Sequence, residues 1–278
     1  MIPQLYNLLR NVQVTVSPFR CVLRALHLGS MYKWLLLAGL TSAPMWATMT
    51  FVPGGFANTE ADSNGISPLS VGSFYLDHGS AGSGRMQILF DASEFTGLGG
   101  PISISEIAFR DDSEDTTLSF TATLGDIQVY LDTTSQTING ISSTFANNTN
   151  NEQLVYSGSI TFNIPAESST PRCFCYTIDF STPYTYDPTQ GNLLLDILII
   201  TGNDPNTSSL PTLDYSRSSS AMAVAVDYSS SADTTGAAGS DQGWPTQFTY
   251  DLATPEPSTW VLMLTGGAAL GLWRRRRS

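Results

Sequence analysis

The chain has 278 residues, of which 41% are hydrophobic, 10% aromatic and only 13% charged, about half the share of charged residues in an average globular protein. This composition excludes a wholly disordered chain, because disorder goes with low hydrophobicity and high charge. Residues 48–254 hold four arginines and no lysine against 23 acidic residues, a net charge of −19, which excludes a body that binds the phosphates of DNA or RNA.

Residues 31–57 are typical of an export signal. They open with the basic start Met31-Tyr32-Lys33, continue with an apolar run at residues 34–40 and break at Thr-Ser-Ala-Pro. An apolar run this short predicts a secretory signal peptide rather than a membrane span. Small residues place the expected cleavage after Ala47 or after Ala57.

Residues 1–30 precede this signal and show no strong structural period. They are basic and contain a lone cysteine, Cys21. We interpret them as sequence upstream of a true translation start at Met31. The alternative is that they form an unusually long basic region of the signal itself.

Residues 58–254 form the expected body of the protein, an acidic ectodomain. Apolar and polar residues alternate with a period of two along most of it, which predicts β-strands. A near-continuous apolar run at residues 193–200 predicts a strand that is covered on both sides. The alternation at residues 102–109 slips at Glu106, as a β-bulge would cause. We expect strands at residues 86–90, 102–109, 118–124, 127–131, 160–164, 174–180, 193–200, 222–226 and 247–252.

These short strands are separated by polar turns, and no helical pattern that could form a crossover lies between them. The arrangement predicts an all-β fold, with an antiparallel β-sandwich or jelly-roll-like ectodomain. An N-terminal signal segment and one short C-terminal transmembrane helix complete the expected organisation.

An acidic cluster lies between two of the expected strands. Oxygen ligands at a loop tip suit calcium, but an EF-hand is excluded because Thr116 stands where that loop requires glycine and Ala122 where it requires glutamate. An irregular calcium site and a solvated turn both remain open. No other cofactor is expected. The candidate calcium ligands are Asp111, Asp112, Glu114 and Asp115.

Cys173 and Cys175 are the cysteines that remain in the body. On a strand they share one face, with Cα atoms near the outer limit of disulfide geometry. A local disulfide in an oxidising compartment is one interpretation, and free or intermolecular thiols are the other. Two thiolates without a second pair or a nearby histidine make a poor zinc site.

Catalytic signals in the body are sparse. His78 is its one histidine, and the G-x-S-x-G motif of a hydrolase nucleophile does not occur. A carboxylate pair for glycoside hydrolysis would be visible only in three dimensions. We therefore expect a non-enzymatic protein; the alternative is a secreted hydrolase acting on glycan or peptide. Aromatic side chains can stack on sugars, and the candidates for polysaccharide contact are Tyr184, Tyr186, Tyr215 and Trp244.

The C-terminal tail, residues 255–278, combines three features. Pro255-Glu256-Pro257 comes first, residues 258–273 form a largely apolar stretch of 16 residues, and Arg274, Arg275, Arg276 and Arg277 follow. As a helix the stretch would be about 24 Å long at roughly 1.5 Å per residue, against a hydrocarbon core of about 30 Å. The arginines should stay on the cytoplasmic side, which agrees with an exported N-terminus.

This tail resembles the PEP-CTERM sorting signal of Gram-negative, exopolysaccharide-producing bacteria. The resemblance rests on the Pro-Glu-Pro motif, the apolar stretch and the arginine cluster at this spacing, and it does not extend to the body. It implies that an exosortase-type membrane protease handles the precursor at the inner membrane. It also implies delivery to the cell envelope, the surface or the extracellular matrix.

Taken together, these features predict an exported envelope or matrix protein with a non-enzymatic structural or polysaccharide-associated role. Its expected partners are the exosortase and exopolysaccharide, with passing contact to the inner membrane through the C-terminal helix.

Overall fold

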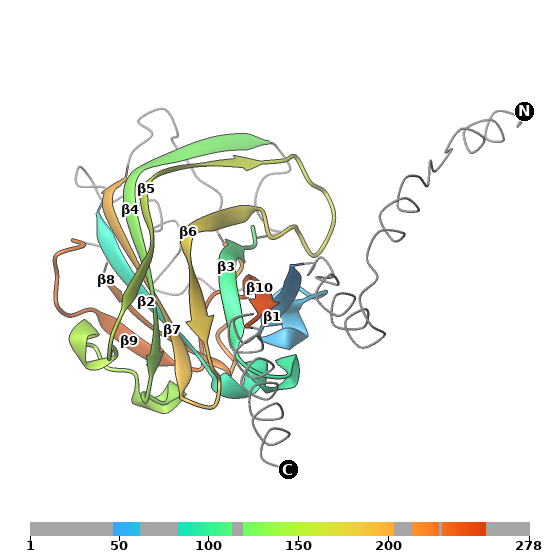
Figure 1. Ribbon diagram of the computed structural model, residues 1–278. Coiled ribbons are helices and arrows are strands. Elements are labelled where there is room, and N and C mark those ends of the chain that lie inside the picture. Colours follow the sequence, from blue (N-terminus) through green and yellow to red (C-terminus); the bar gives the residue numbers. More distant parts are fainter. Residues whose placement is uncertain (1–46, 62–82, 113–118, 203–212, 228–229, 254–278) are drawn as a thin grey trace, which may run out of the picture. The chain divides into compact units, whose positions relative to one another are not determined.

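The computed structural model describes residues 47–61, 83–112, 119–202, 213–227 and 230–253 (Figure 1). Within these ranges the chain forms strands and short 3₁₀ turns. The strands are β1 (Thr48–Val52), β2 (Gly84–Phe90), β3 (Ile102–Phe109), β4 (Phe120–Thr134), β5 (Gln153–Ile164), β6 (Tyr176–Tyr186), β7 (Asn192–Gly202), β8 (Met222–Asp227), β9 (Ala237–Ser240) and β10 (Thr246–Leu252).

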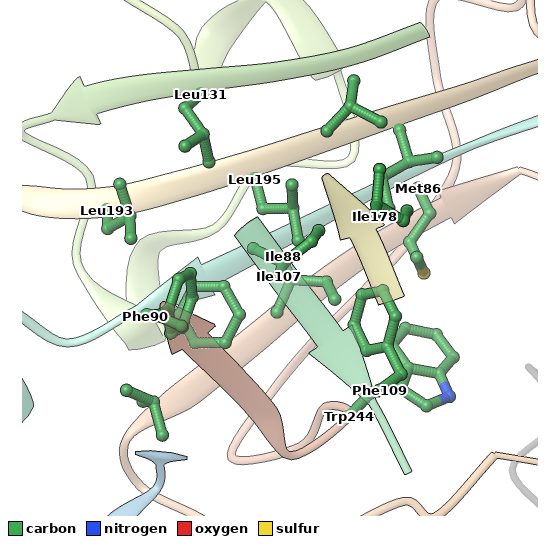
Figure 2. Packing of buried hydrophobic residues seen from close by; sticks show 14 of the residues in the cluster. Met86, Ile88, Phe90, Ile107, Phe109, Leu131, Ile178, Leu193, Leu195 and Trp244 are labelled. Atoms are coloured by element: carbon green, nitrogen blue, oxygen red, sulfur yellow. The ribbon is translucent and has the colours of Figure 1, made fainter. Parts of the chain in front are cut away.

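The strands form two sheets, and every pairing is antiparallel. One sheet has the order β1-β10-β3-β6 and the other the order β5-β4-β7-β2-β8-β9. Side chains of both sheets meet in one hydrophobic cluster, in which the Phe90 ring of the larger sheet lies edge-on to the Phe248 ring of the smaller at 5.1 Å. Figure 2 shows this core between the strands. The expected all-β, antiparallel class is confirmed.

The bulge expected near Glu106 is present. Thr249 of β10 pairs with Glu106 and Tyr250 pairs with Ile104, so Ser105 is an extra residue in β3. The same slip recurs in the pairing of β3 with β6. One inserted residue restores the inward direction of the apolar side chains on both sides of it, which is why the alternation of the sequence changes phase there.

The strand expected to be covered on both sides is β7. Leu193, Leu195 and Ile197 point into the main core, whereas Leu194 is fully buried on the opposite face. There it packs with Leu89 of β2, Ala223 of β8 and the two isoleucines of the segment around the 3₁₀ turn η5 (Ile138–Gly140), Ile138 and Ile141. This segment therefore closes part of the outer face of the larger sheet, and the near-continuous apolar sequence of β7 reflects two cores.

The N-terminal boundary of the body differs from the expected one. Residue 58 was expected to begin the body, but β1 lies ten residues earlier and pairs with β10 over its whole length. Val52 has no exposed surface, and the Phe51 ring lies 5.2 Å from that of Phe174. The period-two pattern misses β1 because Thr48–Val52 is short and follows directly on the apolar signal, with which it merges.

The segment after β1 is held by a buried ion pair. Arg110, at the end of β3, forms a salt bridge with Asp214, and both side chains are almost fully buried. The guanidinium also donates to the carbonyl oxygens of Phe56 (Nη1, 2.7 Å) and Thr59 (Nη2, 2.6 Å). The Ala61 N–H donates to the Asp214 carboxylate at 3.2 Å. Residues 56–61 thus complete the hydrogen bonding of a buried charge.

None of the helices in the described ranges has the length and apolarity to cross a membrane. The C-terminal helix predicted for residues 258–273 lies outside the described residues.

Removal of β1 and the turn that follows it should destabilise the body. A protein of residues 58–253 loses the burial of Val52 and the Phe56 acceptor of Arg110, each worth roughly 1–3 kcal/mol. Its free energy of unfolding should fall by about 3–5 kcal/mol relative to residues 48–253, measured by urea unfolding. Equal midpoints for the two proteins would contradict the structural role of this segment, and it would then be dispensable in the processed protein.

Candidate functional site

A group of polar residues surrounds Asp196, on the outer face of the larger sheet. Asp196 lies in the middle of β7, in register with Gln87 of β2 on one side and Tyr130 of β4 on the other. Residues paired across neighbouring strands point to the same face, so the three side chains form a row across the sheet. Asp196 and Gln87 are nonetheless buried, with 1% and 0% of their surface exposed.

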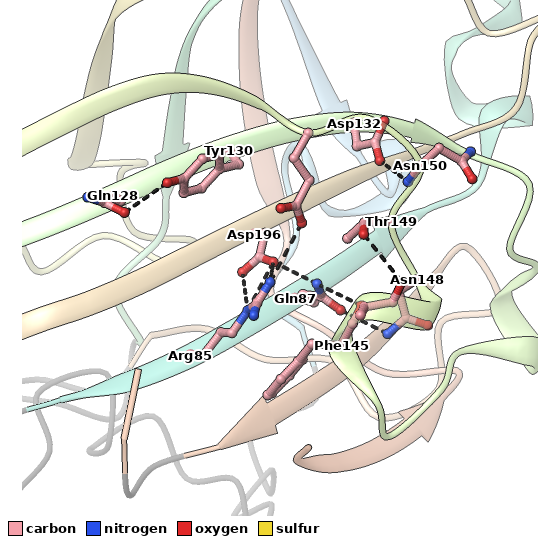
Figure 3. A network of polar contacts seen from close by, with 12 residues as sticks. Arg85, Gln87, Gln128, Tyr130, Asp132, Phe145, Asn148, Thr149, Asn150 and Asp196 are labelled. Atoms are coloured by element: carbon pink, nitrogen blue, oxygen red, sulfur yellow. Dashed lines mark hydrogen bonds and ion pairs between the residues drawn. The ribbon is translucent and has the colours of Figure 1, made fainter. Parts of the chain in front are cut away.

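Asp196 is held by a dense set of hydrogen bonds (Figure 3). Arg85 of β2 donates from Nε to both carboxylate oxygens at 3.1 Å and from Nη2 to Oδ2 at 2.5 Å. Gln87 Nε2 donates to Oδ2 at 2.6 Å. A fork of two guanidinium donors on one carboxylate is the strongest arrangement of this pair. Both oxygens of Asp196 therefore accept hydrogen bonds from side chains of β2.

The loop between β4 and β5 closes over this cluster. Its 3₁₀ turn η6 (Phe145–Asn147) places the Phe145 ring 4.8 Å from the Arg85 guanidinium, and Asn148 Nδ2 donates to Gln87 Oε1 at 2.8 Å. Asp132 at the end of β4 accepts from the backbone N–H groups of Asn150 and Asn151. These contacts fix the whole loop on the outer face of the sheet.

Glu152 brings a second carboxyl group to the cluster. One of its oxygens lies 3.7 Å from Arg85 Nη2, and its side chain is one-quarter exposed. Burial raises the pKa of Glu152 to about 7; the charge of Asp196, which also hydrogen-bonds to it, adds to the rise, and Arg85 opposes it. Glu152 therefore gains and loses its proton near neutral pH, and one arginine contacts both carboxyl groups.

This geometry differs from that of a glycosidase site. Two catalytic carboxyl groups must stand about 5–9 Å apart, so that a sugar or a water fits between them. Glu152 and Asp196 instead both contact the same Arg85 nitrogen, Nη2, at 3.7 and 2.5 Å, and Asp196 is closed off from solvent, with 1% of its surface exposed. The arrangement can hold a loop and respond to pH.

The expected aromatic contacts to polysaccharide are wrong. Tyr184, Tyr186, Tyr215 and Trp244 are 8%, 0%, 4% and 1% exposed and belong to the main hydrophobic cluster. Tyr186 donates its hydroxyl hydrogen to the Gly191 carbonyl, and Tyr215 lies edge-on to Trp244 at 5.0 Å. A polar tip lets a large aromatic residue enter a core, and sequence alone does not distinguish this use from surface stacking.

The candidate calcium ligands are only partly described. Asp111 is buried and forms an ion pair with Arg172 at 3.0 Å, and it also accepts a hydrogen bond from the Tyr176 hydroxyl. Asp112 directly follows it, whereas Glu114 and Asp115 lie outside the described residues. An ion pair accounts for the burial of Asp111, and calcium binding by this cluster stays a prediction.

The structure joins Cys173 and Cys175 as a disulfide, with Cα atoms 5.3 Å apart. Of the two interpretations left open, it adopts the local bond. Glu167 lies beside the bond, and its carboxylate and the two sulfur atoms are all within 4.8 Å of one another. In the described ranges these three potential metal ligands lie close together, although the disulfide occupies both sulfur atoms.

Sequence analysis missed most of the Asp196 cluster. Asp196 was visible as one acid in an apolar run, but Arg85, Gln87 and Glu152 lie 44 to 111 residues from it along the chain. A local signal did exist, because Arg85 and Gln87 occupy the outward positions of a strand whose inward positions are Met86, Ile88 and Phe90. That alternation identifies an outer face, but it does not indicate which residues of the neighbouring strands lie beside Arg85 and Gln87.

Comparison with known proteins identifies the tail alone. Residues 253–277 match the PEP-CTERM protein-sorting motif, in agreement with the resemblance seen in the sequence. The motif marks an exported protein that is held in the membrane and then sorted to the cell surface through an exosortase. No curated protein matches the chain.

Glu152→Gln should change the pH dependence of stability. The folded state raises the pKa of Glu152, so the stability that the group contributes is present at low pH and is lost as the pH rises through about 7. Gln imitates the protonated form. At about pH 5 the variant and the parent should be equally stable, and at about pH 8 the variant should be more stable by about 1 kcal/mol, discounted for partial exposure. Urea unfolding at both pH values measures this, and a difference independent of pH would contradict the raised pKa of Glu152.

Proposed function

We propose that this chain is the precursor of a non-enzymatic protein of the bacterial envelope or extracellular matrix, sorted by an exosortase and associated with exopolysaccharide. The observation that carries the proposal is the sorting motif at residues 253–277, directly after the last strand of an acidic β-sandwich body. The proposed cell is Gram-negative, with the precursor held in the inner membrane before its tail is removed or exchanged.

The chemistry of the tail supports transient rather than permanent anchoring. As a helix, residues 258–273 would span about 24 Å at roughly 1.5 Å per residue, which is short for a membrane core of about 30 Å. Arg274 to Arg277 hold the cytoplasmic end. Pro255 and Pro257 disfavour helix at the outer face and leave the backbone extended, which suits a protease that cleaves there.

The charge distribution of the body supports a location outside the cytoplasm. Arg85, Arg110 and Arg172, three of its four arginines, are paired with Asp196, Asp214 and Asp111. Acids therefore dominate its surface, which keeps the body soluble and repels anionic lipid head groups. The Cys173–Cys175 bond fits an oxidising compartment.

The closed carboxyl pair supports a non-enzymatic role. Glu152 and Asp196 both contact the Arg85 guanidinium, and Asp196 is buried, so this pair is poorly placed to act on a substrate. A secreted hydrolase is therefore the weaker proposal.

A polar strip on β4 and β5 supports association with polysaccharide. Thr121 pairs with Asn163 and Thr123 with Thr161, and their side chains hydrogen-bond across the two strands at 3.1 and 2.8 Å. The adjacent Leu124 and Phe162 belong to the core, so the strip lies on the outer face. Hydroxyl and amide groups held in one plane can exchange these bonds for bonds to sugar hydroxyls without reordering the backbone.

The processed ends test the sorting proposal. In a host with an exosortase, the mature protein should begin at Thr48 and end near Pro257. Cleavage after Ala47 preserves β1 and the Phe56 acceptor, whereas cleavage after Ala57 removes both. Mass spectrometry of the protein in the surface fraction determines both its N-terminus and its C-terminus.

Replacement of Arg274–Arg277 by glutamine is the matched test of the tail, because it leaves the motif and the body intact. Retention and processing should both decrease. Recovery of an unprocessed C-terminus at Ser278 from the surface fraction of the parent protein would overturn the sorting proposal. An N-terminus at Asn58 would instead contradict only the assignment of the cleavage site.

The polar strip can be tested by binding. A Thr123→Val and Thr161→Val double variant removes two hydroxyl groups and keeps the shape of both side chains. Binding of the processed protein to the host's exopolysaccharide, measured by co-sedimentation, should weaken by about 3–10-fold per lost bond. Thr185→Val is the control, because Thr185 is an exposed strand residue of the other sheet. Equal losses for both proteins would rule out the strip as the contact.

A further inference from the structure

The disulfide between Cys173 and Cys175 belongs to a group of three metal-ligating side chains. The Glu167 carboxylate and both sulfur atoms lie within 4.8 Å of one another, and all three residues are partly exposed. The sequence offered only two sulfur ligands, which is too few for a zinc site. The loop before β6 adds the third, six residues upstream of Cys173.

The backbone that carries the cysteines is held by contacts independent of their bond. Phe174, between them, packs its ring 5.2 Å from that of Phe51 and 5.0 Å from the Arg110 guanidinium. On the N-terminal side, the Arg172 N–H donates to Glu60 Oε1 at 2.9 Å, and the Arg172 side chain pairs with Asp111. With the disulfide opened, these contacts still keep both thiols on the same side of the segment.

Glu167 is oriented in advance. Its Oε2 accepts from the Cys173 N–H at 2.8 Å, and its Oε1 accepts from the Ser169 hydroxyl at 2.5 Å. Hydrogen bonds of this kind fix the direction of a carboxylate ligand and are a normal part of metal sites in proteins. The carboxylate is thereby placed against the sulfur atoms without any bond to them.

We propose that reduction of the Cys173–Cys175 bond turns this cluster into a binding site for a thiophilic divalent cation of the Zn²⁺ type. A dithiol reductant supplies two electrons, the sulfur–sulfur bond breaks, the dithiol becomes a cyclic disulfide and two cysteine thiols form. The cation then displaces the two thiol protons and binds both thiolates and the Glu167 carboxylate. Three protein ligands leave a fourth tetrahedral position for water.

The disulfide and the metal exclude each other. In the oxidised state neither sulfur is a thiolate, and one carboxylate does not hold such a cation by itself. The site therefore exists only where the chain is reduced, and oxidation releases the cation. This inference does not depend on the sorting tail or on contact with polysaccharide.

The test uses the full-length protein in detergent, in a Cys21→Ser background so that Cys173 and Cys175 are its only thiols. Co²⁺ is the probe, because thiolate ligation gives it a sulfur-to-metal charge-transfer absorption. The reduced protein should bind one Co²⁺ per chain with this absorption, and Zn²⁺ should displace it. The oxidised protein, measured in parallel, should lack the absorption and accounts for metal bound elsewhere in the chain.

Two variants locate the site. Glu167→Gln retains both cysteines and should weaken binding by the reduced protein at least about tenfold, since even outer partners of metal ligands are worth roughly 10–100-fold. Glu94→Gln changes a carboxylate that bonds to Gly54 in another part of the body and should bind as the parent does. No uptake by the reduced protein, equal uptake by the oxidised protein, or unchanged affinity in Glu167→Gln would each overturn the proposal.

Discussion

The buried ion pair of Arg110 and Asp214 is the contact on which the arrangement of the body depends. A charge inside a protein is tolerated only when its partners are complete. Arg110 meets this requirement with a carboxylate from residues 213–216, two carbonyl groups from residues 56–61 and the Phe174 ring beside the disulfide. Segments far apart in the chain thus meet at one guanidinium, and the loss of any of them removes a contact from a buried charge.

The same solution recurs at two other places in the body. Arg85 binds Asp196 on the outer face of the larger sheet, and Arg172 binds Asp111 near the end of β3. Each pair joins two parts of the chain that are at least 61 residues apart in the sequence. The few arginines of this acidic body therefore form internal ion pairs. The acidic residues that remain on the surface keep the body soluble.

The strands were predictable because their signal is local. The period of two located most of β2, β3, β4, β7 and β10, and the change of phase at Glu106 located a bulge. Contacts between distant residues left no such signal. The alternation around Tyr184 fits a core position and a sugar-binding face equally well, and only the packing of the two sheets decides between them. The position of Glu167 beside the two cysteines could not be predicted for a similar reason, because a single acidic residue in a loop does not indicate which residues lie near it.

The pairing of β1 with β10 has a consequence for an exported chain. Thr48 lies opposite Tyr250, so the start of β1 and the end of β10 lie at the same end of this sheet. A signal before Thr48 and a tail after Leu252 would therefore attach the body to the membrane by two connections at one end of this sheet. Because β10 lies between β1 and β3, this sheet closes only after the last strand has crossed the membrane. The smaller sheet would then be complete only once translocation of the body has finished, and before the C-terminal tail is cleaved.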